Sequence, residues 1–278
     1  MSSKRELGGE ALLEALERGE VRVAEPSSVA PDGTASWVVN TWVKEALLDI
    51  FRQSTIVPHG IEEPRDPHAR FAPHAFLDKE PFKVRRFSPE SGVRLVPGGS
   101  AVRRGAHVGR GTVLMPPCYV NVGAFVGENS MIDSHALVGS CAQVGEGVHL
   151  SAAAQLGGVL EPAAARPVIV EDGAFIGGGV GIYEGVRVGA GAVIAAGVVL
   201  TAKTLVFDLV REELLAPASS APQIPARAVV IPGTRPAKGQ WAREQGLSQA
   251  CALIVKYRDA STDAATALEE ALRPRGGM

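Results

Sequence analysis

Aliphatic residues recur at every sixth position through the middle of the chain. Ten consecutive positions of this pattern are aliphatic: Val102, Val108, Leu114, Val120, Val126, Ile132, Val138, Val144, Leu150 and Leu156. The pattern resumes with Val170, Ile176, Ile182, Val188, Ile194 and Leu200. Ordinary strands alternate with a period of about 2 and helices repeat at about 3.6 residues. A six-residue period, with small residues or acids after many of the aliphatic ones, therefore predicts short flat strands separated by tight turns.

These short strands are expected to form a parallel β-helix, so the chain is predicted to be mainly β. Three hexapeptides make one triangular coil, and successive coils stack at about the 4.8 Å spacing of paired strands. Hexapeptide repeats are a recognised signature of this fold. The step from Leu156 to Val170 is fourteen residues, which predicts a loop that bulges from the coil. A second excursion is expected at about 207–224, and 226–236 is expected to add a last partial coil.

The two ends of the chain follow other patterns. The segment "GGEALLEALERGE" has helical spacing with Ala11, Leu12, Ala15 and Leu16 on one face, ends at Gly19 and leads into a β-prone "VRV". A second helix is predicted over "NTWVKEALLDIFRQS", with Asn40 or Thr41 as its cap and Trp42, Ala46, Leu47 and Ile50 on one face. Residues 57–98 are predicted to be irregular with a few short strands.

Near the C-terminus, "SQACALIVKYRD" is predicted to be a strand, followed by a helix capped by Ser261 or Thr262. The predicted domains are therefore an N-terminal α/β domain (1–98), the β-helix (99–235) and a C-terminal strand and helix (236–278).

Composition limits the classes of partner. The chain has 278 residues and 32 glycines, but only 5% of its residues are aromatic, which indicates a core of small aliphatic side chains. A net charge of −2 favours neither nucleic acid nor an anionic membrane as partner. Three cysteines without a CxxC pair suit a reducing cytoplasm, and neither a signal peptide nor a membrane span is expected.

Three segments carry a resemblance to a known family. They are "VLMPPCYVNVGAFVGENSMIDSHALVGSCAQVGEGVHLSAAAQLGGVLEP", "PVIVEDGAFIG" and "ACALIVKYRD". Together they resemble tetrahydrodipicolinate N-succinyltransferase, the succinyl-CoA-dependent enzyme of bacterial lysine and diaminopimelate synthesis. The resemblance implies a left-handed parallel β-helix with a small N-terminal α/β domain and a C-terminal strand and helix. It also implies a homotrimer with active sites between subunits, and an acyl-CoA arm that lies along the outside of the coils.

The resemblance also identifies candidate catalytic residues. The acid of the family's "M-[VI]-D" stretch corresponds to Asp133, and the family's tryptophan two residues later is His135 here. A second catalytic carboxylate lies in the family segment "EDNxFIGARSEVVEG"; this chain reads "EDGAFIGGGVGIYEG", which leaves Gly181 at that position. Glu184 or Glu161 is a candidate to replace the missing carboxylate.

The reaction implied is transfer of an acyl group from a thioester to an amine. The attacking nitrogen must be neutral, so a carboxylate that takes its proton assists, as do backbone N–H groups that hold the oxyanion. Asp133 suits the first role, although an acid after an inward aliphatic residue also suits a turn. His135 is a candidate base or acceptor contact, with Asp133 as its orienting partner, or a surface turn residue. His149 is expected to be structural.

Small residues are the candidates for the acyl-CoA contacts, because they allow the pantetheine arm to approach the backbone. These residues are Gly157, Gly158, Gly177, Gly178, Ala195 and Ala196, although β-helix turns need glycine in any case. Lys203, Lys238 and Lys256 are candidates for the CoA phosphates, and Lys83 for a substrate carboxylate. The donor is expected to be succinyl-CoA or acetyl-CoA.

Other functions remain open at this stage. The lost carboxylate at Gly181 is compatible with a relative that acylates a related amino-acid intermediate, as in tabtoxin-type β-lactam biosynthesis. A catalytically silent β-helix scaffold is a further alternative. A zinc site of the γ-carbonic anhydrase type is not favoured, since His107, His135 and His149 fall on different faces of the coil and no metal is expected.

Overall fold

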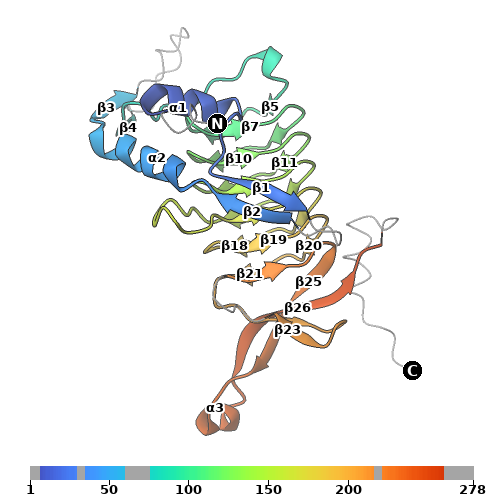
Figure 1. Ribbon diagram of the computed structural model, residues 1–278. Helices are drawn as coiled ribbons and strands as arrows, with labels where there is room; N and C mark the ends of the chain where they lie inside the picture. Colours follow the sequence, from blue (N-terminus) through green and yellow to red (C-terminus); the bar gives the residue numbers. More distant parts are fainter. Residues whose placement is uncertain (1–6, 30–34, 60–75, 216–220, 260–278) are drawn as a thin grey trace, which may run out of the picture.

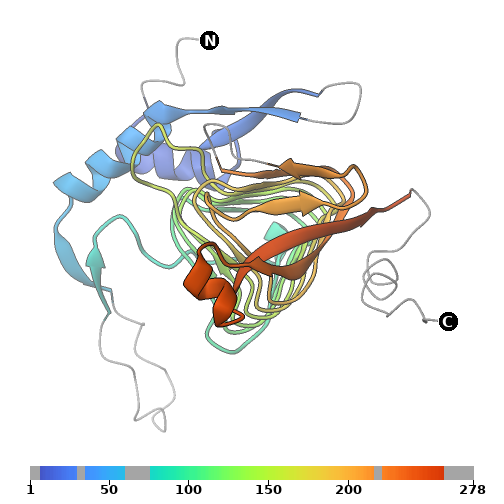
Figure 2. The same ribbon diagram turned by 90° about the horizontal axis from the view of Figure 1, so that it is seen from below.

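The hexapeptide pattern forms a triangular stack of short parallel strands. The computed structural model describes residues 7–29, 35–59, 76–215 and 221–259, and each of the sixteen patterned positions lies in a two-residue strand. The coils are seen side by side in Figure 1, and Figure 2 looks along the stack onto its triangular outline. The predicted parallel β-helix is therefore confirmed.

The strands divide into three faces. Face 1 consists of β6 (Ala101–Val102), β9 (Tyr119–Val120), β12 (Leu137–Val138), β15 (Gln155–Leu156), β18 (Gly181–Ile182) and β21 (Val199–Leu200). Face 2 consists of β7 (His107–Val108), β10 (Phe125–Val126), β13 (Gln143–Val144), β16 (Ile169–Val170), β19 (Arg187–Val188) and β24 (Gln223–Ile224). Face 3 contains β5 (Arg94–Leu95), β8 (Val113–Leu114), β11 (Met131–Ile132), β14 (His149–Leu150), β17 (Phe175–Ile176), β20 (Val193–Ile194) and the start of β25 (Ala228–Pro236). The turns between faces form three edges, which we call edge 1–2, edge 2–3 and edge 3–1.

Pairing stays in register from coil to coil. In face 3, Ile132 pairs with Leu114 on one side and Leu150 on the other, and all three are fully buried. Burying one such side chain contributes about 1.5–3 kcal/mol. Because the period is even, the second residue of each strand always points into the prism, which explains why the aliphatic pattern is so strict.

Two segments leave the regular coil, as the sequence predicted. The turn between β15 and β16 spans 157–168, whereas a regular turn such as 133–136 has four residues. The second excursion lies between β21 and β24 and contains β22 (Val206–Asp208) and β23 (Glu213–Leu215), which pair antiparallel. We call 157–168 the wall loop, because it borders the pocket described below.

The N-terminal elements pack on edge 1–2 and face 2. They are α1 (Gly9–Glu17), β1 (Ala24–Val29), β2 (Ala35–Val39), α2 (Thr41–Gln53), β3 (Ile56–His59) and β4 (Phe76–Lys79). They form a second core that includes Val122 and Cys141 of the coil. Gly105 approaches α1 so closely that a Cβ atom would lie 2.7 Å from Leu13 Cδ2.

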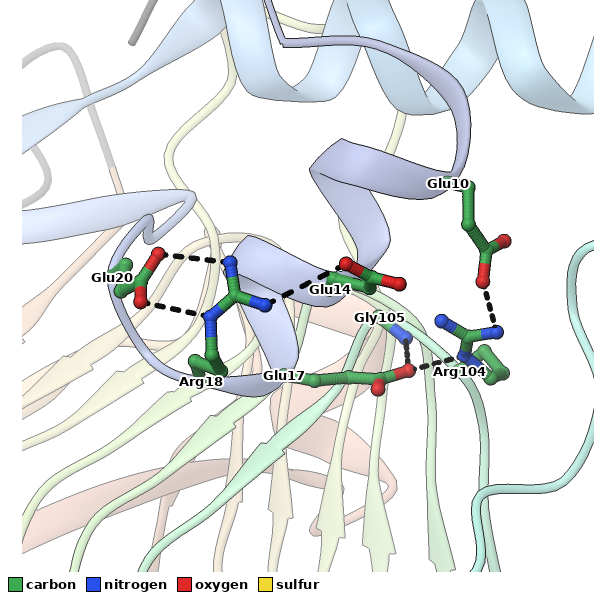
Figure 3. A network of polar contacts seen from close by, with 7 residues as sticks. All are labelled: Glu10, Glu14, Glu17, Arg18, Glu20, Arg104 and Gly105. Carbon is green, nitrogen blue, oxygen red and sulfur yellow. Dashed lines mark hydrogen bonds and ion pairs between the residues drawn. The ribbon is translucent and has the colours of Figure 1, made fainter.

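Ion pairs fix α1 on the first coil. The Glu17 carboxylate accepts hydrogen bonds from Arg104 Nε at 2.6 Å and from the Gly105 amide at 3.0 Å, and Arg104 also pairs with Glu10 (Figure 3). On the other side of the helix end, Arg18 pairs with Glu14 and Glu20. The side chain of Glu17 is mostly buried, so this contact is better shielded from solvent than the Arg18 pairs.

Three details of the N-terminal predictions are wrong. In α1 the buried residues include Leu13, whereas Ala11 is exposed. Asn40 precedes α2 but does not cap it with its side chain, which donates to Arg22 O at 2.8 Å. The "VRV" segment precedes the strand, which begins at Ala24.

The C-terminal part extends the stack as an arm. β25 pairs with β20 and then runs antiparallel to β26 (Ser248–Tyr257), with the short helix α3 (Gln240–Glu244) at the far end (Figure 1). The strand predicted over 248–259 is thus present. The predicted terminal helix, capped by Ser261 or Thr262, lies outside the described residues.

Candidate functional site

Asp133 lies in the turn that leaves face 3 for face 1. Its amide donates to Leu150 O at 2.9 Å, which fixes the backbone, and its half-buried carboxylate accepts a 2.6 Å hydrogen bond from the Ser134 amide. One carboxylate oxygen is thus used by the turn. The other has no hydrogen-bond donor within the described part of the chain, so it is available to a ligand.

His135 lies at the top of the same turn but does not contact Asp133. Its backbone is left-handed, with φ of 62°, and its imidazole is exposed. Within the described residues no hydrogen bond joins it to Asp133, so the predicted orienting pair is not formed. The physical reason is local, because the Asp133 carboxylate binds its own turn while the left-handed residue is directed outward.

Cys118 is a neighbour of Asp133 that the sequence pattern did not single out. Burial raises the pKa of the Cys118 thiol, and the negative charge of Asp133 raises it further. The thiol donates to Ser100 Oγ at 3.5 Å. A thiol held neutral in this way is a poor nucleophile, so Cys118 is not a candidate for the attacking group.

Below Asp133, edge 3–1 is a strip of small residues. The next three turns of this edge read Ser151-Ala152-Ala153, Gly177-Gly178-Gly179 and Ala195-Ala196-Gly197. A Cβ at Gly177 would lie 2.6 Å from the Ala196 nitrogen, so coil stacking alone requires this glycine. A Cβ at Gly178 would approach only Ala152 O, at 3.4 Å, so packing leaves this position free. Ala195 is buried, whereas Ala196 is exposed.

The other candidates lie on edge 1–2, around a pocket of about 680 Å³. The wall loop forms one side, and the turn after β18 forms the other. Gly157, Gly158, Glu161 and Glu184 all line it. A volume of this order is typical of small-molecule sites, which span about 300–1,000 Å³. Four residues predicted separately are therefore brought together, although on a different edge from Asp133.

Glu184 and Glu161 do not replace the missing carboxylate beside Asp133 in the same chain. Face 1 separates the two edges, and β12 lies two coils from β18, or about 10 Å along the stack. One Glu184 oxygen accepts a 2.9 Å hydrogen bond from the Ala202 amide. The expectation that either glutamate acts with Asp133 thus requires a second copy of the chain.

Tyr183 also lines the pocket, and the sequence analysis did not single it out. Its ring lies over two glycines of adjacent coils: a Cβ at Gly157 would be 2.7 Å from its Cδ1, and a Cβ at Gly181 would be 2.5 Å from its Cε2. A signal was present, because residues two apart in a strand point the same way, and Tyr183 follows Gly181 by two. The ring therefore takes the space that a side chain at position 181 would need.

The wall loop is held by a buried lysine on α2. Lys44 is fully buried and its Nζ donates to Pro162 O at 3.1 Å and to Ala165 O at 2.9 Å. Burial lowers the pKa of Lys44 below its usual range. The helical pattern gave no sign of this, since a lysine between Val43 and Glu45 is normally exposed.

The remaining predicted contacts are spread over the molecule. Lys203 is exposed beside edge 1–2, Lys256 lies on β26, and Lys238 is exposed next to α3. Lys83 is exposed in the chain that leads into the first coil. The structure therefore does not gather these lysines into one phosphate site.

The three histidines of the coil have separate environments. His107 on face 2 contacts Glu17 O at 2.9 Å and stacks on Phe125, while His149 on face 3 lies 5.0 Å from the ring of Phe175. Over the ranges that the structure describes, no three His, Cys, Asp or Glu side chains are grouped to hold a metal ion. Over the same ranges no helix combines the length and the hydropathy needed to cross a membrane.

Comparison with known proteins shows the family to which the chain is similar. Residues 10–52 match the family described as tetrahydrodipicolinate N-succinyltransferase N-terminal, and residues 167–202 match the hexapeptide repeat of succinyl-transferase. A 2,3,4,5-tetrahydropyridine-2,6-dicarboxylate N-succinyltransferase from Afipia carboxidovorans is 41% identical over 95% of this chain and 88% of its own length. Proteins of the same name from Nitrobacter winogradskyi and Polynucleobacter asymbioticus are 42% and 41% identical, over 93% and 95% of this chain and 86% and 88% of their own lengths.

Proposed function

Because the chain belongs to the 2,3,4,5-tetrahydropyridine-2,6-dicarboxylate N-succinyltransferase family, we propose that it transfers an acyl group from acyl-coenzyme A to an amine of a small amino-acid acceptor. The observation that carries this proposal is Asp133, a half-buried carboxylate with one oxygen free, at the head of a strip of small residues. The carboxylate is available to the amine, and the strip to the thioester arm.

In the proposed reaction the neutral amine nitrogen attacks the thioester carbonyl carbon. A C–N bond forms, the amine proton passes to Asp133, and collapse of the tetrahedral adduct breaks the C–S bond. The thiolate of coenzyme A leaves and takes a proton, so the products are an amide and free coenzyme A. A base that removes this proton contributes about 10²- to 10⁴-fold to the rate.

The acyl group proposed is succinyl, which the names of the relatives support. The acceptor proposed is a small amino acid or its cyclic imine, as in lysine and diaminopimelate synthesis. Departures from the family at His135 and Gly181 concern the acceptor side of the site. We further propose a cytoplasmic location, with which three unpaired cysteine thiols are compatible.

The proposed assembly is a homotrimer with its active sites between subunits. Asp133 and the pocket lie on opposite edges of face 1, so one chain does not bring them together. Face 1 also exposes apolar side chains, with Tyr119 at 37% and Val199 at 53%. A cyclic trimer joins two different surfaces of neighbouring copies, which is what a site built from two edges needs.

The first experiment tests the chemistry. Free thiol release is measured with succinyl-CoA and acetyl-CoA against a panel of amino-acid acceptors, for the wild type and Asp133→Asn. We expect a loss of at least about 100-fold in kcat with little change in acyl-CoA binding. Full activity of Asp133→Asn would remove the central claim.

The second experiment tests the strip on edge 3–1. Ala196→Leu adds bulk to an exposed turn of this edge, and Ala190→Leu adds the same bulk to a turn of edge 2–3. We expect only Ala196→Leu to weaken acyl-CoA binding in a calorimetric titration, at equal thermal stability. Equal weakening by both variants contradicts a specific contact on edge 3–1.

The third experiment tests the shared site. Glu161→Arg is expected to inactivate the half-site at the pocket of edge 1–2, and Asp133→Asn the half-site on edge 3–1. When the two inactive chains are mixed at random, about one interface in four unites intact halves, so about a quarter of wild-type activity should return. No recovery, with trimers shown to exchange subunits, contradicts an intersubunit site.

A further inference from the structure

In the pocket on edge 1–2, the Tyr183 ring lies where the family resemblance predicts the carboxylate of position 181. The Tyr183 ring spans Gly157 and Gly181, and its hydroxyl would lie 2.9 Å from a Cβ at position 181. A glutamate at 181 and the ring in this place exclude each other. The two glycines and the tyrosine are thus one arrangement, in which a neutral ring has taken the place of a charged side chain.

The charged side chains of the pocket are mostly acidic. Glu161 and Glu184 line it, and neither carboxylate has an ion-pair partner in the part of the chain that the structure describes. Arg166, the cation among the described residues of the lining, uses Nε and Nη2 to donate to Gly185 O at 2.8 Å and Ala221 O at 2.9 Å. These two carbonyls belong to the turn after β18 and to the chain before β24, so Arg166 is engaged by the backbone.

The other side of the wall loop is acidic as well. A second hollow there is lined by Glu45, Asp49, Arg52 and Glu161, and Arg52 is paired with Asp49 at 2.8 Å. An anionic group of a ligand would therefore be repelled by Glu161 and Glu184 in the pocket and by Glu45 and Asp49 in the second hollow. An ammonium group would meet carboxylates and the face of an aromatic ring, which is a favourable environment for a cation.

The geometry points to Tyr183 as the residue that determines acceptor specificity, and to an acceptor that ends in an ammonium group on a short aliphatic chain. The aliphatic part of such a ligand fits the small apolar residues Val159, Pro162 and Ala165, which also line the pocket. The ammonium group lies between the Tyr183 ring and the two glutamates. This inference rests on the proposed function only in taking the pocket as the acceptor's binding place.

The test uses three amino acids of similar length that differ at the side-chain end: L-lysine, L-2-aminoadipate and L-norleucine. Their binding to the full chain is measured by isothermal titration, with acyl-CoA binding measured in parallel. We expect L-lysine to bind more tightly than the other two. Tyr183→Ala should weaken the binding of L-lysine by about 2- to 30-fold, the range of an aromatic–cation contact, and leave the binding of acyl-CoA unchanged.

Three further variants make the result specific. Tyr183→Phe keeps the ring and should keep the preference. Gly181→Ala displaces the ring without adding charge and should reproduce the effect of Tyr183→Ala. Trp241→Ala, which removes an exposed aromatic side chain on α3 at the far end of the C-terminal arm, is the matched control and should bind L-lysine like the wild type.

Three results overturn the inference: L-2-aminoadipate bound as tightly as L-lysine, L-lysine binding that Tyr183→Ala leaves unchanged, or no binding of L-lysine at all. Failure of the proposed function is distinct, because it appears as a lack of acyl-CoA binding and of thiol release with every acceptor.

Discussion

The buried carboxylate of Glu171 pairs with Arg187 inside the coil and also binds Trp37 of the N-terminal hairpin, so removal of its charge tests how much this contact contributes to stability. The Glu171 carboxylate accepts hydrogen bonds from Trp37 Nε1 at 2.7 Å, from Arg187 Nε at 2.7 Å and from the Ala190 amide at 3.0 Å. The side chains of Glu171 and Arg187 are only 7% and 8% exposed. Strand β2 thus contacts edge 2–3 through one carboxylate.

The perturbation is Glu171→Gln, which keeps the shape and removes the charge. Arg187 then remains buried without its anion, and the described residues offer its guanidinium one further side-chain hydrogen bond, to Gln223 Oε1 at 3.0 Å. Breaking a buried pair by removing one partner costs about 3–5 kcal/mol. We expect the free energy of unfolding to fall by about this amount, since the amide also offers one acceptor oxygen where the carboxylate had two.

The assay is urea unfolding at one fixed protomer concentration, because any assembly makes the midpoint depend on concentration. The control is a double-mutant cycle with Arg187→Met. Once Arg187 is replaced, Glu171→Gln should cost less than it does in the wild type, so the sum of the two single effects should exceed the effect of the double variant by more than about 1 kcal/mol.

A small effect would refute the reasoning. If Glu171→Gln costs less than about 1 kcal/mol, the pair behaves like an exposed one. Single effects that add within about 0.5 kcal/mol would likewise mean that the two groups are independent. If salt strongly reduced the effect of Glu171→Gln on the free energy of unfolding, the pair would also behave like an exposed one, because buried pairs are screened much less.

Three further predictions concern single residues. Burial lowers the pKa of Lys44, so between that lowered pKa and the ordinary pKa of about 10.4 the unfolded chain binds more protons than the folded one. The free energy of unfolding of the wild type should therefore rise with pH in this range relative to that of Lys44→Met. A free-energy difference between the two proteins that falls with pH contradicts this. Gly127→Ala would bring a Cβ within 2.5 Å of the next coil's backbone and should cost about 1–3 kcal/mol in urea unfolding, whereas Gly178→Ala should change stability by less than about 0.5 kcal/mol; equal effects contradict the stacking argument. Burial raises the pKa of Cys141 to about 12, so a thiol reagent at pH 8 should label this residue only after unfolding, and mass spectrometry of labelled native protein checks it.

The candidate site was predictable only in part. Asp133 and the small residues of edge 3–1 follow from the repeat and the family resemblance, and the structure leaves the Asp133 carboxylate one free oxygen. The predicted contact between Asp133 and His135 did not form, because the turn uses the carboxylate itself. Glu161 and Glu184 were named for a different place. They meet at a pocket only because the wall loop folds back beside the turn after β18.

The sequence by itself determined the coil. A strict six-residue aliphatic period leaves one arrangement in which every sixth side chain is buried, so strands, turns and register follow from local pattern. Only the tertiary structure decided what lies against the coil. Lys44 is buried because it binds the wall loop, and Tyr183 covers Gly181 and Gly157 of two adjacent coils. Neither contact follows from the six-residue period. Repeats are set by neighbours of fixed spacing, whereas a pocket depends on which distant segments happen to pack together.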